Sequence, residues 1–339
     1  MPSPATLVIS AALDLEDADE RRRRAVPRAG GAASIDLVSQ VRSTLEERAG
    51  ATMIAEEASP SGANGTSRVT VIKPAPRLPH LALSELWHYR ELLGTLVWRD
   101  VVVRYKQTFL GVAWAILVPL VTAIVYIVIF GKFANFPAGG VKYQVLVMAG
   151  VLPMQYFASA MTGSSMSLAA NLNLVTKVYF PRTLLPLAAV LVPFVDFLVG
   201  IPVLVLFMWI YDAWPGGIEV LAAPLFMALA VLAVLGLGLF LSAANVRYRD
   251  VRHMIPVLLP ILPLVSGVMY AVQSIEEKYQ WILALNPMTA VISGWRWAVI
   301  DGPPPDVGQT ALGVAVAVFL FISGLAVFRS SEPRFADTI

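Results

Sequence analysis

Long stretches of uncharged apolar residues, separated by short polar clusters, dominate the chain from Gln107 to Phe328. Each stretch reaches about 20 residues, the length that an α-helix needs to cross a hydrocarbon core of about 30 Å. The strict alternation of barrel strands is missing, so the pattern predicts helices. We expect six membrane-spanning helices, at residues 109–130, 143–168, 184–210, 220–243, 254–272 and 308–328.

The segment before the first predicted span has a different pattern. Between Leu83 and Val97, apolar residues recur at helical spacing with charged residues on the other side, which predicts an amphipathic helix at the membrane interface. A linker helix away from the membrane is the alternative. Residues 1–80 are rich in Pro, Gly, Ser and charges of both signs, which is typical of a disordered extension. The predicted regions are the cytoplasmic extension 1–80, the interface helix with its basic lead-in 81–106, the transmembrane domain 107–330 and a short cytoplasmic tail 331–339.

A further apolar stretch, from Tyr279 to Ile300, contains Asn286 and Pro287 near its middle. Because proline disfavours helical geometry at the preceding residue, we expect a re-entrant pair of short helices on the periplasmic side. The alternative is a seventh span, which would place the termini on opposite sides. With six spans and both termini in the cytoplasm, eleven Lys and Arg residues flank the membrane on the inside and four on the outside, namely Lys132, Lys142, Lys278 and Arg296. This bias follows the positive-inside rule and favours six spans.

Composition agrees with an all-α integral membrane protein. Of the 339 residues, 57% are hydrophobic and 14% are charged, whereas a typical globular domain carries about 25% charged residues. The net charge of +2 gives no reason to expect a nucleic-acid partner. The chain has no cysteine, and its three histidines lie outside the predicted spans, so we expect no metal or haem site within the membrane.

The sequence also lacks a phosphate-cradling loop of the form G-x-x-x-x-G-K followed by Ser or Thr. Without that loop the chain cannot hydrolyse ATP in the manner of P-loop proteins. We therefore expect no catalytic residue and no cofactor bound by this chain.

Asp196 is the only carboxylate in the middle of a predicted span. Placing it there costs about 2.5–3.5 kcal/mol on insertion scales, so it needs a polar partner or water. It either lines a polar pathway or forms a hydrogen bond with a neighbouring helix or subunit. Aromatic residues are also frequent near the spans, where they form interfacial belts or line a conduit whose ring faces suit sugars; the conduit candidates are Asp196 with Trp114, Tyr126, Tyr156 and Trp295.

Two predicted cytoplasmic loops, 171–186 and 245–254, share a short, basic, aromatic pattern. Simple positive-inside loops explain the charge. Aromatic and arginine side chains are also good interface anchors, so both loops are candidates for contact with a partner that moves them. The candidate residues are Lys177, Tyr179, Phe180, Arg182, Arg247, Tyr248, Arg249 and Asp250.

The chain resembles ABC-2 type permeases of the polysaccharide export group, which includes exporters of O-antigen, capsule and teichoic acid. The resemblance covers roughly residues 83–330 and rests on four segments in the expected order: RYKQTFLGVAWAILVPL (104–120), KVYFPR (177–182), RYRDV (247–251) and LNPMTAVISGWRWAVIDG (285–302). The N-terminal extension has no counterpart in this pattern.

The resemblance implies a homodimer of six-span subunits in the inner (cytoplasmic) membrane, paired with two copies of a separate ATPase that binds ATP and magnesium. The loops matching Asn171–Arg182 and Asn245–His253 would be coupling helices seated on the ATPase. The cargo would be a lipid-linked glycan, such as O-antigen for lipopolysaccharide biosynthesis. Three basic residues lie where a lipid pyrophosphate would approach, although membrane anchoring explains them equally well: Arg99, Arg104 and Lys106.

Three other functions remain open at the level of sequence. An ABC-2 exporter of a drug or lipid would have the same fold and coupling. An ion-coupled carrier would transport without an ATPase and would depend on Asp196. A membrane enzyme acting on lipid-linked sugars would need clustered acid–base groups, and the predicted outer loops hold few.

Overall fold

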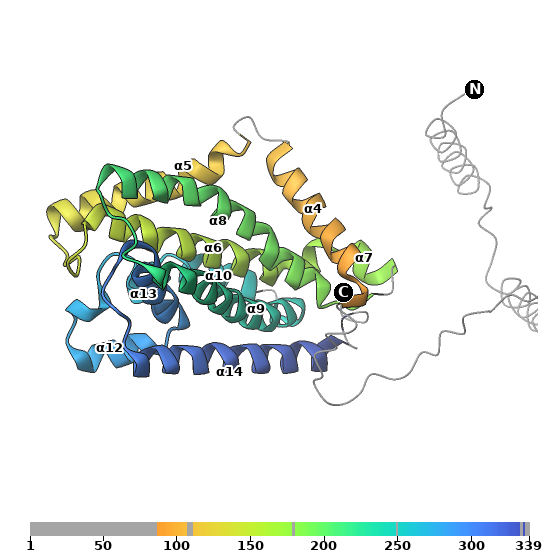
Figure 1. Ribbon diagram of the computed structural model, residues 1–339. Helices are drawn as coiled ribbons and strands as arrows, with labels where there is room; N and C mark the ends of the chain where they lie inside the picture. The colour runs from red at the N-terminus through yellow and green to blue at the C-terminus, as the bar shows by residue number, and fades with distance from the viewer. Residues whose placement is uncertain (1–86, 107–110, 178–179, 249, 333–334, 336–339) are drawn as a thin grey trace, which may run out of the picture. The chain divides into compact units, whose positions relative to one another are not determined.

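The computed structural model describes residues 87–106, 111–177, 180–248, 250–332 and 335 (Figure 1). These residues form helices and no strands. Five of the described helices are long and apolar enough to cross a membrane. They are α5 (Ala113–Tyr126) continued by η1 (Ile127–Phe133), α6 (Tyr143–Ala170), α8 (Leu184–Ile210), η2 (Ile218–Ala222) continued by α9 (Ala223–Arg247), and α14 (Val307–Ser331).

These five helices confirm the apolar stretches predicted at 109–130, 143–168, 184–210, 220–243 and 308–328. The predicted extension 1–80 and most of the predicted tail 331–339 lie outside the described residues.

Helix α6 lies at the centre of the bundle. It packs against α5, α8 and α9, and α14 packs on the other side of α9 (Figure 1). Among the five long helices, α6 is the most enclosed and α5 the least. Glycines on the neighbouring helices suit this position, because a Cβ atom on Gly200 of α8 would lie 2.5 Å from Leu152, and one on Gly238 of α9 would lie 2.2 Å from the hydroxyl oxygen of Ser164.

Two glycines set the contact between α9 and α14. A Cβ atom added to Gly324 would lie 2.0 Å from the carbonyl oxygen of Gly236. A Cβ atom on Gly236 would lie 2.5 Å from the backbone nitrogen of Phe321. The two helices therefore touch through their backbones, a packing that side chains larger than hydrogen would prevent.

The predicted span at 254–272 is wrong as a single helix. The structure instead forms α10 (Val251–Leu258), a turn, α11 (Leu262–Val265) and, after a non-helical stretch, η3 (Val272–Ser274). Pro260 and Pro263 explain the interruption, because proline removes a backbone donor and clashes with the preceding turn. Gly267, with φ of +73°, then turns the chain away from helical geometry.

The predicted break at Asn286 and Pro287 is confirmed. Helix α12 (Glu277–Ala284) ends before it and α13 (Pro287–Ile300) begins after it. The side chain of Asn286 caps α13 by accepting a hydrogen bond from the backbone nitrogen of Met288 at 3.1 Å, and proline suits the first helical position. Neither helix has the length of a span, so this stretch does not form the seventh spanning helix of the alternative topology.

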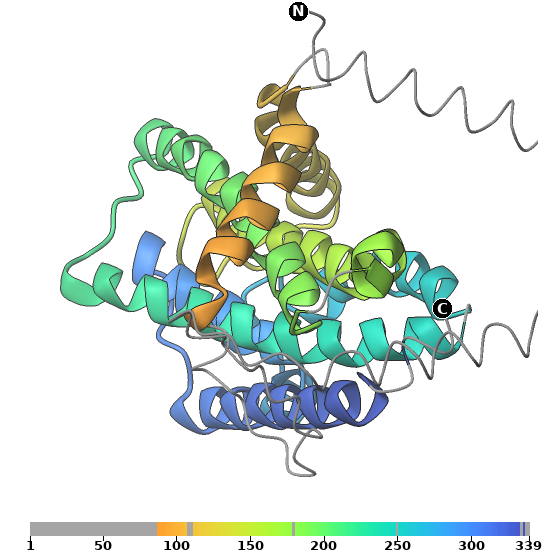
Figure 2. The same ribbon diagram turned by 90° about the vertical axis from the view of Figure 1, so that its right-hand side faces the viewer.

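Helix α4 (Arg90–Lys106) forms within the region predicted as the amphipathic helix and its basic lead-in. Its apolar side, with Tyr89, Leu93 and Leu96, packs on the bundle, whereas Trp87 and Trp98 are exposed. Helix α4 crosses α8 obliquely and packs against it (Figure 2). One face is therefore used for packing within the chain, a role that the interfacial prediction did not include.

Candidate functional site

One end of the bundle gathers both predicted coupling loops. A buried cluster there joins the middle of α4 to the ends of α6, α8, α9 and α14 through Leu96, Leu168, Leu184, Ala243 and Phe328. We call this the basic end, defined by the helix termini Ala170, Leu184, Arg247 and Ser331. The loops between α6 and α8 and between α9 and α10 therefore lie on the same side as the end of α14.

The first loop is tied to the C-terminal end of the chain. The guanidinium of Arg182 donates to the carbonyl oxygen of Glu332 at 2.5 Å and lies 6.0 Å from the ring centre of Phe335. Phe180 is buried in the cluster. These two predicted coupling residues thus have partners inside the chain. Tyr179 and the side chain of Lys177, which ends α7 (Leu172–Lys177), lie outside the described residues.

The second loop is exposed. Arg247 lies over the ring of Tyr248 at 5.3 Å, and both side chains face solvent together with Asp250. Asp250 precedes the first residue of α10, while Arg249 lies outside the described residues. Of the predicted coupling residues that the structure describes, those of this loop are free to meet a partner.

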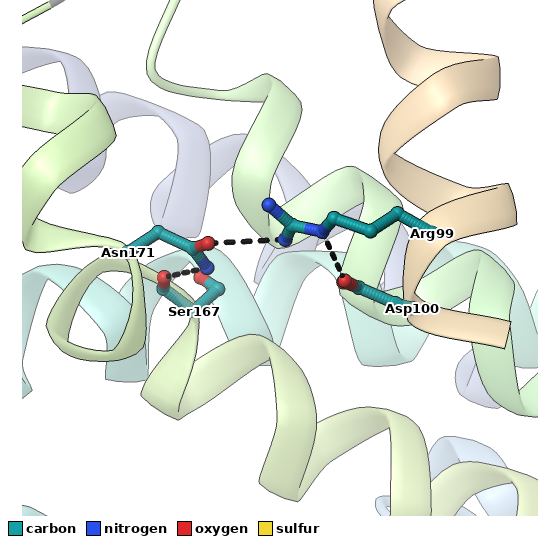
Figure 3. A network of polar contacts seen from close by, with 4 residues as sticks. All are labelled: Arg99, Asp100, Ser167 and Asn171. Carbon is teal, nitrogen blue, oxygen red and sulfur yellow. Dashed lines mark hydrogen bonds and ion pairs between the residues drawn. The ribbon is translucent and has the colours of Figure 1, made fainter. Parts of the chain in front are cut away.

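Arg99 connects α4 to the start of the first loop (Figure 3). Its guanidinium donates to the side-chain oxygen of Asn171 at 3.1 Å and forms an ion pair with Asp100 at 2.8 Å. Asn171 ends α6 and donates in turn to the carbonyl oxygen of Ser167 at 2.9 Å. The predicted phosphate-binding residue Arg99 therefore holds the entry to the loop in place.

Asp196 has two partners from the end of α4. A guanidinium nitrogen of Arg104 lies 2.7 Å from one carboxylate oxygen, and the phenol of Tyr105 donates to the other. Burial, with the hydrogen bond to Asp196, raises the pKa of Tyr105 above its usual value. The structure thus supplies the hydrogen bond to a neighbouring helix that the sequence offered as one of two roles for this carboxylate.

A cavity of about 300 Å³ opens beside this ion pair, between α5, α6, α8 and the end of α4. Four predicted residues line it: Arg104, Trp114, Tyr156 and Asp196. The hydroxyl of Tyr156 is buried without a hydrogen-bond partner in the described part of the chain. The cavity therefore combines apolar walls with a few polar groups, as ligand sites do.

The other predicted conduit residues, and the predicted phosphate-binding residue Lys106, lie elsewhere. Trp295 is buried behind the cavity, with its ring 5.3 Å from that of Phe197. Tyr126 packs against Phe130 at 6.0 Å. Lys106 is exposed at the end of α4. The structure thus brings together only part of the predicted set.

Sequence reasoning missed the role of Arg296. It counted this residue among the outer flanking charges, but the structure buries it in α13. Its guanidinium donates to four backbone carbonyls: Leu146 at 3.0 Å, Gly267 at 2.7 Å, Val268 at 2.6 Å and Tyr270 at 3.1 Å. The sequence carried one sign of a buried role for Arg296, because this cation lies inside an apolar stretch, between Trp295 and Trp297.

The same non-helical segment receives further side-chain donors. The phenol of Tyr143 donates to the carbonyl oxygen of Met269 at 2.8 Å, and Asn286 donates to the hydroxyl of Ser266 at 2.8 Å. Irregular backbone at membrane depth requires such internal partners. Arg296 is thus the centre of a structural clamp on the end of the broken span.

No group of three His, Cys, Asp or Glu within the described ranges is arranged to hold a metal ion.

Comparisons with known proteins agree with the resemblance found in the sequence. Residues 91–300 match the family model of ABC-2 type transporters. The chain is 30% identical over 249 residues to the O-antigen export system permease protein RfbA of Klebsiella pneumoniae, covering 74% of this chain and 95% of that protein. It is 29% identical to the protein of the same name from Myxococcus xanthus, covering 75% of this chain and 98% of that protein.

A third relative is the polysialic acid transport protein KpsM of Escherichia coli, 27% identical over 69% of this chain and 91% of that protein. The family model covers more than half of the present sequence, and the relatives are covered almost from end to end. The chain belongs to the ABC-2 type transporter family.

Proposed function

We propose that this chain is the permease subunit of an ABC exporter that moves a lipid-linked polysaccharide across the inner membrane. The observation that carries the proposal is the 30% identity to an O-antigen export permease over 95% of that protein's length. The polysialic acid transport protein has a cargo of the same chemical class by its name. A drug or lipid as cargo has no comparable support.

The proposed topology has six crossings and both termini in the cytoplasm. Helix α9 ends at the basic end, and α14 also ends there. The chain between Arg247 and Val307 must then travel from the basic end to the opposite end. This supports α10 and α11 as an interrupted crossing, followed by α12 and α13 as a re-entrant pair on the far side.

The motor of this exporter is a separate ATPase chain, present in two copies, which binds the ATP and magnesium. We place its contact on the exposed second loop, at Arg247, Tyr248 and Asp250. A movement of the ATPase against this loop would be transmitted to the bundle through α9 and α10. The loop suits this role because arginine and tyrosine are frequent interface anchors.

The permease itself is proposed to be a homodimer, as the family resemblance implies. The side chains of Val118, Val121 and Val125 on α5 are exposed, so lipid or a second copy covers them. The chain lacks cysteine, which makes a single Val121→Cys variant a direct test. Disulfide formation between two copies in membranes would place α5 at the dimer contact.

Deletion and reconstitution test the function. Deleting the gene should abolish surface polysaccharide, and the wild-type chain should restore it. In proteoliposomes, transport should require the ATPase and ATP. Transport on an ion gradient alone, without a nucleotide-hydrolysing companion, would replace this proposal with an ion-coupled carrier.

A further inference from the structure

Helices α6 and α9 run in the same direction, and both finish at the basic end, at Ala170 and Arg247. Each of them leads into one of the two predicted coupling loops. The two helices are therefore direct connections between these loops and the bundle. The contact that holds α6 to α9 near these ends decides whether the loops move together or separately.

Small and polar residues form the contact between α6 and α9. On α9, Gly238, Ser242 and Asn245 follow one another at spacings of four and three residues, which places them on one face of the helix. Gly238 lies against Ser164 of α6, where a Cβ atom would clash with the serine hydroxyl. The hydroxyls of Ser242 and Ser167 are 3.3 Å apart. The helices are therefore close together over about two turns of α9.

Asn245 ties the end of α9 to α6. It is buried, with 8% of its surface exposed. Its amide nitrogen donates to the backbone carbonyl oxygen of Ser165 at 3.1 Å and lies 3.5 Å from the sulfur of Met166. An aliphatic side chain of the same size would fill this space without a directional contact. Because a hydrogen bond is directional, the bond to Ser165 fixes the rotation of α9 about its own axis.

This rotation decides where the second loop points. Arg247 follows Asn245 by two residues, which is about 200° around an α-helix. When Asn245 faces α6, Arg247 is therefore turned away from α6. The side chain of Arg247 is exposed and lies over the ring of Tyr248. The inward contact of Asn245 thus presents the two residues that we place against the ATPase.

The α6 side of the contact leads to the first loop. Ser167 lies beside Ser242, and its carbonyl oxygen accepts a hydrogen bond from Asn171 at 2.9 Å (Figure 3). Asn171 ends α6 and accepts a hydrogen bond from Arg99 of α4. A displacement of α9 at Asn245 is therefore passed to the segment at which the first loop begins.

We propose that Asn245 is a positioning residue that makes the two coupling loops move as one unit. Its hydrogen bond to Ser165 sets the direction of Arg247 and Tyr248, and the contact between α6 and α9 passes their movement to the first loop. In this role Asn245, buried between the helices, acts without touching the ATPase or the cargo. The inference rests on the proposed function and adds the connection between the two loops within each subunit.

Removing the hydrogen bond while keeping the volume of the side chain tests this role. We expect Asn245→Leu to co-purify with the ATPase and to retain ATP hydrolysis by the complex. Surface polysaccharide in the producing cells should fall by about tenfold, because a buried hydrogen bond is worth on the order of one such factor in an equilibrium.

Ser330→Ala is the matched control, and it should leave export unchanged. Ser330 is an exposed polar residue near the end of α14 and donates to the carbonyl oxygen of Val327 in its own helix. Normal export by a well-expressed Asn245→Leu protein would overturn the inference. Loss of assembly or of ATP hydrolysis in proportion to the loss of export would also overturn it, because Asn245 would then serve folding alone.

A disulfide tests the joint movement in a second way. The chain has no cysteine, so Ser167→Cys with Ser242→Cys introduces two thiols where the hydroxyls are 3.3 Å apart, a separation that suits a disulfide. If α6 and α9 move as one unit, oxidation in membranes should leave export unchanged. In a protein that also carries Asn245→Leu, oxidation should raise export towards the wild-type level.

The outcomes that contradict the joint movement are specific. Export that stops on oxidation and returns on reduction would show that the two helices must slide past each other. Failure of the two thiols to form a disulfide would show that the helices are not held together. Oxidation without recovery of export in the Asn245→Leu protein would show that the lock between the helices is not what Asn245 provides. Each of these results would overturn the inference.

The two proposals fail differently. If deleting the gene leaves surface polysaccharide unchanged, or if no ATPase co-purifies with the wild-type chain, the proposed function is wrong. If wild-type export depends on the ATPase and Asn245→Leu exports normally, only the role of Asn245 is wrong.

Discussion

Arg104 at the end of α4 and Asp196 in the middle of α8 form an ion pair at 2.7 Å, although 92 residues separate them in the sequence. This contact fixes the helix that precedes the first long span against the third segment of the bundle. It also gives the sole mid-span carboxylate a partner, and it forms one wall of the cavity.

Removing one partner of this ion pair should lower the stability of the protein more than removing both partners. We expect Asp196→Leu to leave the guanidinium of Arg104 without its partner and to destabilise the protein by about 1 kcal/mol, a value lowered by the partial exposure of the pair. The double variant Asp196→Leu with Arg104→Met should recover part of the loss. Thermal unfolding in detergent, followed for both single variants and the double variant, measures the coupling; strictly additive effects would contradict it.

Arg296 should be essential for folding. Arg296→Met removes the donor for four carbonyls, and Arg296→Lys cannot reproduce its planar geometry. We expect a loss of about 3 kcal/mol or more for the methionine variant. Lys278→Met is the control, because Lys278 is exposed. Expression and thermal unfolding in detergent provide the measurement, and equal stability of the two variants would contradict the clamp.

The contact between α9 and α14 should reject a larger residue at position 324. Gly324→Val places a side chain against the backbone of Gly236, and such overpacking typically costs about 1–3 kcal/mol. Gly94→Ala in α4 is a matched control, since a Cβ atom there meets nothing within 4 Å. A lower unfolding temperature for the first variant only is expected, whereas tolerance of valine would show that the helices can separate.

The two predicted coupling loops should respond differently to substitution. Tyr248→Ala should weaken co-purification with the ATPase by about tenfold and leave thermal stability unchanged, because Tyr248 is exposed. Phe180→Ala should lower stability by about 3 kcal/mol, since Phe180 is buried in the cluster at the basic end. Affinity capture and thermal unfolding, both run on each variant, separate these roles; loss of stability in Tyr248→Ala would assign it to packing.

The sequence predicted most of the fold because the length of an apolar stretch is a local property. The five long helices follow their apolar stretches, and the break at Pro287 follows from the geometry of one residue. The failure at 254–272 has the same origin. The prediction of a span there rested on the apolar character of the stretch, which does not register the helix-breaking effect of Pro260 and Pro263.

The candidate site was less predictable, because its contacts join distant segments. Nothing near Asp196 in the sequence identifies Arg104 as its partner. The acceptors of Arg296 are backbone carbonyls, which every residue carries, so no residue type signals them. The inward direction of Arg182 depends on where α14 ends, a feature of packing rather than of the loop itself.

The contact between Arg182 and the segment Glu332–Phe335 has a practical consequence for work on this transporter. Phe335 is buried against Phe328 at 5.3 Å, so the chain at Phe335 lies next to the first loop. An affinity tag or fluorescent protein fused there would crowd the face on which the motor is expected to bind.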